Sequence, residues 1–187
     1  MHIVIIPGTN RSGSLSVGLA RLLLADYHAL GATTDLLELA LTAEFLEPAA
    51  YKQPTAGITA MVNRFLAADG VVFVVPEYNG SYPGVLKLFI DMLPYPQGFE
   101  RRPCAFVGLA AGQFQGLRAV EHLQAVAGYR NAVMYPQRVF IGESFKQLTP
   151  EGTLVDPKLA ERLRAQAAGF TQFITVLTPR SNHADFS

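Results

Sequence analysis

The sequence predicts one α/β domain in which a five-stranded parallel sheet is covered by helices on both faces. Short apolar runs alternate along the chain with segments of helical periodicity. The run GVVFVV at residues 70–75 is apolar at every position, as expected of a strand that is buried on both sides. The length of 187 residues suits a single core. We therefore expect one domain over residues 1–187.

Each expected element follows from its own pattern. The strands are short apolar runs bounded by glycine, proline or polar residues: 2–6, 35–39, 70–75, 104–110 and 132–136. The helices carry apolar residues at three- and four-residue spacing: 15–30, 58–66, 83–93, 112–126 and 156–177. Pro83 stands where a helix favours proline. Residues 40–54 are expected as a loop, and a loop or short hairpin is expected from 137 to 152.

Three loops follow the carboxyl ends of expected strands: the first loop (7–16), the second loop (76–83) and the third loop (110–116). Each loop is rich in glycine, serine, threonine or asparagine. Ligands of open parallel sheets bind outside the carboxyl ends of the strands. We therefore expect one binding site that is built from these three loops.

The first loop, PGTNRSGSLS, has the glycine spacing of a nucleotide-binding P-loop. Ser14 and Leu15, however, stand where that motif has lysine and then serine or threonine, and Asn10 replaces the second glycine of a dinucleotide motif. The hydroxyls, Arg11 and the start of a helix suit a single phosphate. The alternative is an ordinary turn in which Ser14 caps the helix.

The second loop is stiffened by Pro76 and Pro83 and contains the turn signal Asn79-Gly80. Glu77 is a candidate acid or base, and Tyr78 is a candidate for stacking on a ring. The alternative is a strand-to-helix turn with an exposed tyrosine.

The segment PEYNGSYPGVLKLFIDML resembles the P-E-Y-N-x-S-x-P-G-x-L-K-N-x-I-D-W signature of the NAD(P)H-dependent FMN reductases. GTNRSGSLS is similar to the phosphate loop of that family, and AAGQFQGLRAVEHL is similar to its third loop. The resemblance covers nearly the whole chain. It implies a flavodoxin-like three-layer sandwich with strand order 2-1-3-4-5.

The resemblance also implies the site residues. The first loop would hold the FMN phosphate through Thr9, Asn10, Arg11, Ser14, Leu15 and Ser16. The second loop would line the isoalloxazine ring with Pro76, Glu77, Tyr78, Asn79 and Ser81. The third loop would close the ring through Ala111, Gly112 and Gly116. The sequence departs from the family pattern at six positions: Thr9 for serine, Ser16 for the asparagine of many relatives, Ala110 for serine, Gln115 for glycine, Leu88 for asparagine and Met92 for tryptophan.

The activity implied by the resemblance is hydride transfer from NADPH or NADH to FMN, with the electrons passed on to a quinone, azo, metal or free-flavin acceptor. No side chain is needed as a nucleophile or obligatory acid, because the cofactor carries the chemistry. The family implies a homodimer or homotetramer. Two alternatives stay open: a flavodoxin-like FMN electron carrier that does not oxidise NAD(P)H, and a phosphotransferase that uses the G-x-x-x-x-G loop.

Composition narrows the classes of protein to which the chain can belong. Lysine plus arginine and aspartate plus glutamate each number 15, so the chain lacks the basic excess typical of nucleic-acid binding. No apolar run is long enough for a transmembrane helix, and no signal peptide is recognised. The single cysteine, Cys104, is expected to be a buried thiol, and the scattered histidines predict no metal site. We expect a cytoplasmic protein, with His122 in a surface or packing role and Arg101-Arg102 in a solvated turn.

Overall fold

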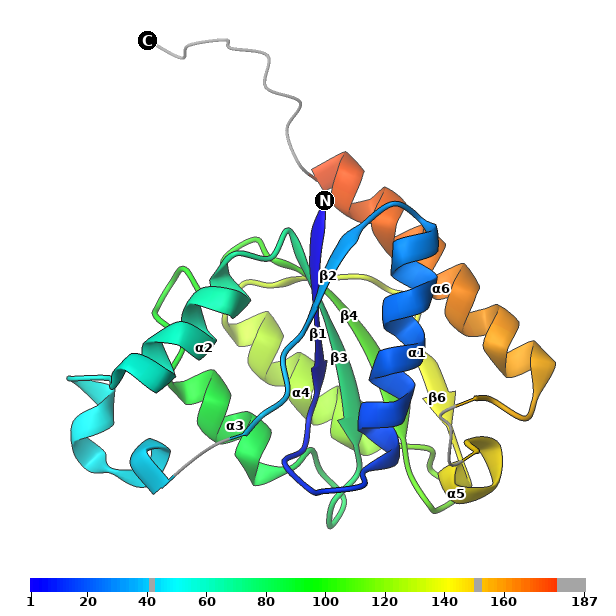
Figure 1. Ribbon diagram of the computed structural model, residues 1–187, viewed down its shortest axis with the longest axis horizontal. Coiled ribbons are helices and arrows are strands. Elements are labelled where there is room, and N and C mark those ends of the chain that lie inside the picture. Colours follow the sequence, from blue (N-terminus) through cyan, green and yellow to red (C-terminus); the bar gives the residue numbers. More distant parts are fainter. Residues whose placement is uncertain (41–42, 150–152, 178–187) are drawn as a thin grey trace, which may run out of the picture.

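A parallel sheet forms the middle layer of the computed structural model, which describes residues 1–40, 43–149 and 153–177 (Figure 1). Its strands are β1 (His2–Pro7), β2 (Thr33–Leu36), β3 (Gly70–Pro76), β4 (Pro103–Leu109), β5 (Val133–Met134) and β6 (Val139–Ile141). The order is β2-β1-β3-β4-β5, and β6 also pairs with β4. The predicted fold class and strand order are confirmed.

Helices cover both faces of this sheet. They are α1 (Leu15–Ala29), α2 (Ala56–Leu66), α3 (Gly84–Asp91), α4 (Leu117–Tyr129), α5 (Ser144–Gln147) and α6 (Pro157–Leu177). In Figure 1, α1 and α6 lie on one face, and α2, α3 and α4 lie on the other. None of the helices in the described ranges has the length and apolar character needed to cross a membrane.

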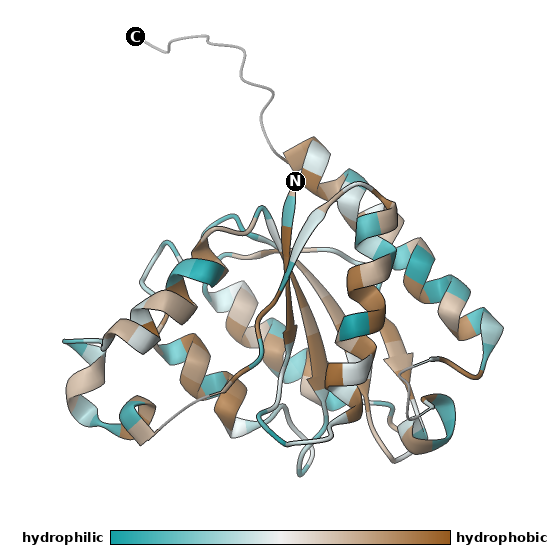
Figure 2. Cartoon of the chain, viewed as in Figure 1, coloured by the Kyte–Doolittle hydropathy of each residue, from teal (hydrophilic) through white to brown (hydrophobic). Residues whose placement is uncertain are grey.

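Alternation along the strands explains the two layers of core. Ile3 and Ile5 of β1 join the cluster beneath α1 and α6, whereas Val4 and Ile6 join the cluster beneath α2, α3 and α4. The strands are accordingly apolar along their length, and the polar residues lie on the outer faces of the helices (Figure 2). Cys104 of β4 is fully buried, as expected, and burial raises the pKa of its thiol to about 12.

The edge beyond β4 differs from the prediction of one strand over 132–136. β5 pairs with the start of β4 and β6 pairs with its end, so a single edge position is filled by two short strands. Pro136 lies between them and has no N–H to donate to a ladder. β6 was not predicted, because its three residues lie in a segment that was expected to be a loop or hairpin.

Other parts of the prediction also differ from the structure. β2 pairs through Thr33–Leu36 rather than 35–39. α4 starts at Leu117 rather than 112, because Gln115 and Gly116 have positive φ angles that a right-handed helix does not allow. The expected loop at 40–54 contains two 3₁₀ turns, η1 (Ala43–Leu46) and η2 (Pro48–Tyr51).

Arg102 does not lie in a solvated turn. Its guanidinium donates to the carbonyls of Ala68 at 2.6 Å and Gln97 at 3.3 Å, and its Nε donates to Gly98 at 2.7 Å. The side chain therefore ties the end of α2 to the segment before β4. Desolvation in this partly buried position lowers the pKa of Arg102.

The side chain of Gln166 on α6 bridges the gap between β5 and β6. Its side chain is 1% exposed, and its Nε2 donates to the carbonyl oxygens of Phe106 at 2.9 Å and Gln137 at 2.8 Å. The Phe106 carbonyl lies on β4, opposite the interruption. The buried amide of Gln166 thus takes the place of the hydrogen bonds that a continuous edge strand would make to β4 here.

We expect Gln166→Leu to lower the free energy of unfolding by about 2–3 kcal/mol, because it leaves two inward carbonyl groups without a donor. Urea denaturation measures this free energy, with the same cofactor content in the wild-type and variant samples. Gln172→Leu, on an exposed position of the same helix, is the matched control and should change stability by less than about 0.5 kcal/mol. Equal effects of the two variants would contradict the role given to Gln166.

Candidate active site

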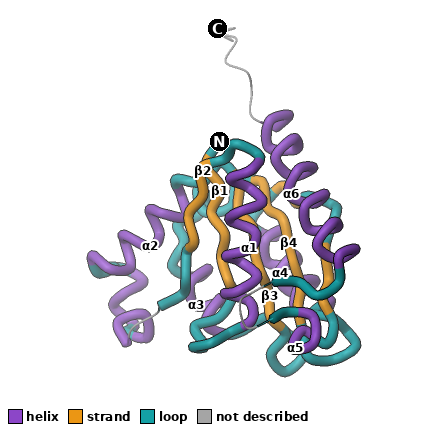
Figure 3. Tube along the Cα trace, turned by 45° about the vertical axis from the view of Figure 1, so that its right-hand side comes forward, coloured by secondary structure: helices purple, strands orange, loops and turns teal. Residues whose placement is uncertain are grey.

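The register of the sheet brings the three loops together at the carboxyl end of the strands. Pro7 at the end of β1 pairs with Val74, and Pro76 at the end of β3 pairs with Leu109 at the end of β4. The backbone N–H of Gly8 donates to Val74 and that of Glu77 donates to Leu109, so the ladder continues into the loops. Figure 3 shows the loops gathered at this end of the strands.

The first loop forms the N-terminus of α1 and is built to receive an anion. Ser14 is the N-cap, as expected, and its Oγ accepts from the N–H of Ser16 and bonds the Ser16 Oγ at 2.6 Å. Among the described residues, the N–H groups of Gly13, Ser14 and Leu15 have no hydrogen-bond partner. The unpaired N–H groups at the start of a helix carry partial positive charge, which favours an anion here.

Arg11 adds a full cation to this helix start. Its side chain makes no hydrogen bond or ion pair with any residue in the described ranges. Its guanidinium is therefore available to an external anion. The nearby Arg21 differs, because it is already paired with Glu38 at 3.2 Å.

The second loop contains a tight hairpin. Tyr78 and Ser81 exchange two backbone hydrogen bonds, of 2.8 and 3.1 Å, around Asn79-Gly80. Both turn residues have positive φ, 52° for Asn79 and 80° for Gly80, which is the pattern of an Asn-Gly hairpin turn. The turn predicted from this dipeptide is confirmed.

Side chains tie this hairpin to its neighbours on both sides. The hydroxyls of Thr9 and Tyr78 lie 2.9 Å apart, which joins the first loop to the second. Ser81 Oγ lies 2.9 Å from His122 Nδ1 on α4. The hairpin is therefore held between the start of α1 and the side of α4, and the exposed His122 has the surface role that was one of the two expected for it.

An ion pair provides a third connection of the second loop. Arg118 donates from Nε at 3.1 Å and from Nη2 at 2.5 Å to the same oxygen, Oε1, of Glu77. The Glu77 side chain is only 8% exposed, whereas that of Arg118 is half exposed. The Arg118 guanidinium also lies 4.4 Å from the centre of the Phe114 ring. The two charges cancel where the second loop meets the start of α4.

The third loop depends on a glycine that packs against the sheet. Gly116 has a φ angle of 84°, and a Cβ at this position would lie 2.6 Å from the backbone nitrogen of Leu109. A side chain there would force the loop away from β4. Gly112 differs, since a Cβ on it would meet nothing within 4 Å. The loop is thus close-packed at its end and open at its start.

Two cavities meet at the carboxyl end of the strands. The main cavity has a volume of about 430 Å³ and is lined by Arg11–Ser16, Pro76–Tyr78, Leu109–Ala111 and Ser144. The end cavity, of about 170 Å³, is lined by Glu77, Asn79, Gly80, Ala110–Gly112, Phe114 and Arg118. They share Glu77, Ala110 and Ala111, so together they form one trough. Its combined size lies within the range of small-molecule sites.

Most of the residues predicted for the site line this trough: Arg11, Ser14, Leu15, Ser16, Pro76, Glu77, Tyr78, Asn79, Ala111 and Gly112. The other four do not line it. Thr9 and Asn10 line a further cavity of about 600 Å³ on the α1 side of the first loop, which shares Arg11–Leu15 with the main cavity. Ser81 is bonded to His122, and Gly116 packs on β4.

Several lining residues were missed from the sequence. Ser144 follows β6, so its position could not be inferred without that strand. Phe114 and Arg118 lie inside the motif of the third loop, and that motif was the available signal for them. Across the part of the chain that the structure describes, no group of three His, Cys, Asp or Glu side chains could hold a metal ion.

The predicted self-association stays a prediction, because a single chain is described. A shallow cavity of about 430 Å³ lies between α3 and α4, lined by Lys87, Ile90, Asp91, Ala125, Val126, Tyr129 and Arg130. The ring of Tyr129 is largely exposed beside it.

Comparison with known proteins gives the family. The family model described as NADPH-dependent FMN reductase matches residues 1–146. An NAD(P)H-dependent FMN reductase of Pseudomonas aeruginosa is 34% identical over 117 residues, which is 59% of this chain and 63% of that protein. A quinone reductase of Escherichia coli strain K12 is 31% identical over 123 residues, 64% of this chain and 65% of that protein. The match thus spans less than two thirds of both relatives. The family resemblance drawn from the motifs is confirmed.

Solved structures agree on the fold. A flavoenzyme NAD(P)H:(acceptor) oxidoreductase from Paracoccus denitrificans superimposes with a TM-score of 0.81 at 23% identity, over 94% of this chain and 97% of that one. A short-chain flavodoxin superimposes with a TM-score of 0.61 at 17% identity, over 92% and 97%. At these identities the likeness shows a flavodoxin-like architecture and no more.

We expect Arg11→Ala to weaken FMN binding by about 10- to 100-fold, because it would remove the charge-assisted contact with the phosphate that is predicted for Arg11. Quenching of flavin fluorescence during titration measures the dissociation constant. Arg21→Ala is the matched control, because Arg21 lies on the α1 side and is already paired with Glu38. The affinity of this variant for FMN should stay within about twofold of the wild type. Unchanged binding by Arg11→Ala would refute the phosphate assignment.

Proposed function

The chain belongs to the NADPH-dependent FMN reductase family, and from this premise we propose that it is an FMN-dependent oxidoreductase. It accepts a hydride from NADPH or NADH and passes electrons to a small-molecule acceptor. The observation that carries the proposal is the trough, which has an anion-binding helix start at one end and a neutral, partly apolar wall at the other.

The residues of the trough fit FMN. The free N–H groups at the start of α1 and the unpaired Arg11 suit the phosphate, which carries negative charge. No lysine is required, since a single terminal phosphate needs no Mg²⁺ bridge. The open volume beside Gly112 and the small side chains of Ala110 and Ala111 leave room for a flat ring.

The chain positions the reaction rather than supplying reactive groups. The redox chemistry would come from FMN, which when bound would supply a ring able to take up a hydride and release electrons. Pro76 and the hairpin hold one wall of the trough, and Ala110–Gly112 form the opposite wall. The contacts from Thr9, Arg118 and His122 hold the second loop in place, and the hydrogen bond from the Glu77 N–H to the Leu109 carbonyl ties it to the strand end that leads into the opposite wall. A fixed wall favours hydride transfer because it orients two rings in contact.

The direct test is the spectrum of the purified protein after addition of FMN. We expect a flavin absorbance band that remains after desalting and is bleached when NADPH or NADH is added without oxygen. Steady-state rates of oxidation of both nucleotides, measured with quinone, azo, ferric and free-flavin acceptors, then show which nucleotide and which class of acceptor the protein prefers.

Two outcomes would contradict the proposal in different ways. A protein that takes up no FMN would refute the cofactor assignment. A protein that holds FMN, but whose flavin is not reduced by either nucleotide, would be an electron carrier and not a reductase.

A further inference from the structure

A buried hydroxyl beside the trough has no partner within the described part of the protein. Across the residues that the structure describes, the buried polar side chains are those of Thr9, Ser16, Ser144 and Gln166. All but Ser144 bond another side chain or a backbone carbonyl. The Ser144 hydroxyl makes no hydrogen bond with any residue in the described ranges. Buried polar groups are nearly always paired, so this hydroxyl calls for a partner that the described chain does not supply.

Ser144 borders the middle of the trough. The residue is 6% exposed and lines the main cavity, but it does not line the end cavity. Its backbone N–H donates to the carbonyl of Ala110 at 3.1 Å, and Ala110 lines both cavities. Ser144 therefore lies beside the junction of the two cavities. One side of this junction has the anion-binding start of α1, and the other has the space proposed for the ring.

The turn that carries Ser144 is fixed to the sheet and to the third loop. Ile141, at the end of β6, pairs with the end of β4. A Cβ on Gly142 would lie 2.8 Å from the Cγ of Gln115, so the turn packs closely against the third loop. Glu143 has a φ angle of 44°, which is uncommon for a residue other than glycine. The fold thus places the Ser144 side chain, and a ligand that bonds it has little ordering cost to bear.

The surroundings of Ser144 favour an uncharged polar partner. The charged side chains of the turn, Glu143 and Lys146, bond each other at 2.6 Å, and more than half of each is exposed. They therefore offer the cavity no net charge. The groups that suit a phosphate, Arg11 and the start of α1, belong to the first loop. A serine hydroxyl both donates and accepts, so another hydroxyl matches it well. In FMN, the hydroxyls lie on the ribityl chain that links the phosphate to the ring.

We propose that Ser144 binds the ribityl chain of FMN through a hydrogen bond between its Oγ and a hydroxyl of that linker. The residue thereby favours flavins whose linker carries hydroxyls. The inference rests on the proposed function, because it takes the trough as the site of FMN. It adds the turn after β6 to the three loops of the site, and none of the three sequence motifs reaches residue 144.

Comparison of FMN with a deoxy analogue tests this contact. The analogue keeps the phosphate and the ring but has hydrogens in place of the linker hydroxyls. Quenching of flavin fluorescence during titration of the apoprotein gives both dissociation constants. We expect Ser144→Ala to weaken FMN binding by about three- to tenfold, which is the value of one neutral hydrogen bond. The same variant should bind the deoxy analogue within about twofold of the wild type, because that ligand has no linker hydroxyl to lose.

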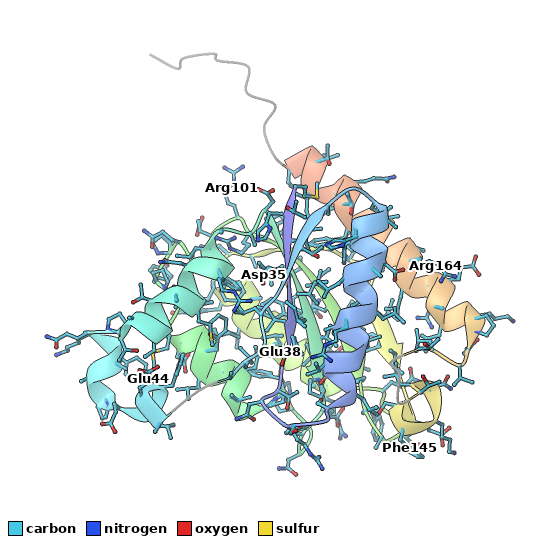
Figure 4. The ribbon with its side chains drawn as sticks, in the orientation of Figure 1. Asp35, Glu38, Glu44, Arg101, Phe145 and Arg164 are labelled. Atoms are coloured by element: carbon cyan, nitrogen blue, oxygen red, sulfur yellow. The ribbon has the colours of Figure 1, made fainter. Side chains whose placement is uncertain are left out.

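Phe145→Ala is the matched control for a change in this turn. Phe145 lies on α5 (Figure 4), is 59% exposed and lines neither part of the trough. We expect its affinities for both ligands to stay within about twofold of the wild type. Arg11→Ala is the complementary variant. It should weaken the binding of FMN and of the deoxy analogue equally, because both ligands carry the phosphate.

Two results would overturn the inference and leave the proposed function standing. If Ser144→Ala binds FMN as tightly as the wild type does, the contact is not made. If the variant binds FMN and the deoxy analogue with equal losses, the effect comes from the shape of the turn, the phosphate or the ring, and not from the linker. If the wild-type protein binds no FMN at all, the proposed function fails and this inference fails with it.

Discussion

The geometry of the site depends on the register of β3 with the two strands beside it. β3 is the central strand, and its pairing with β1 and β4 sets the three loops at one level. Two further N–H groups, on Gly8 and Glu77, extend that pairing into the loops themselves. The loops are therefore anchored to the most buried part of the molecule, where close packing resists displacement.

Two glycines show how little freedom this anchoring leaves. A Cβ on Gly8 would lie 2.9 Å from Leu86 Cδ2, and one on Gly116 would meet the backbone of β4. Above this packed base the hairpin of the second loop is held from both sides by hydroxyl, imidazole and guanidinium contacts. The arrangement leaves the cationic start of α1 at one end of the trough and a neutralised ion pair at the other. A ligand with a charged tail and an uncharged ring matches this distribution.

The sequence predicts the layers and the loops well because both are local patterns. Apolar runs identify β1, β3 and β4, and Ser14 and Asn79-Gly80 identify a helix start and a turn. The errors lie at the edges, where strands are short: β6 has three residues, and β5 has two. The positive φ of Gln115 is another unpredictable feature, since glutamine has no preference for that conformation. Side-chain partners far apart in sequence, such as Thr9 with Tyr78 and Glu77 with Arg118, leave no periodic signal.

We propose that the first loop binds a phosphate and that the rest of the trough binds the attached ring. Calorimetric titration of the apoprotein with FMN and with riboflavin tests it directly, because the two ligands differ only in the phosphate. We predict that FMN binds at least about 100-fold more tightly, since the phosphate gains charge-assisted hydrogen bonds from Arg11 and the start of α1. Equal affinities for the two ligands would contradict the account.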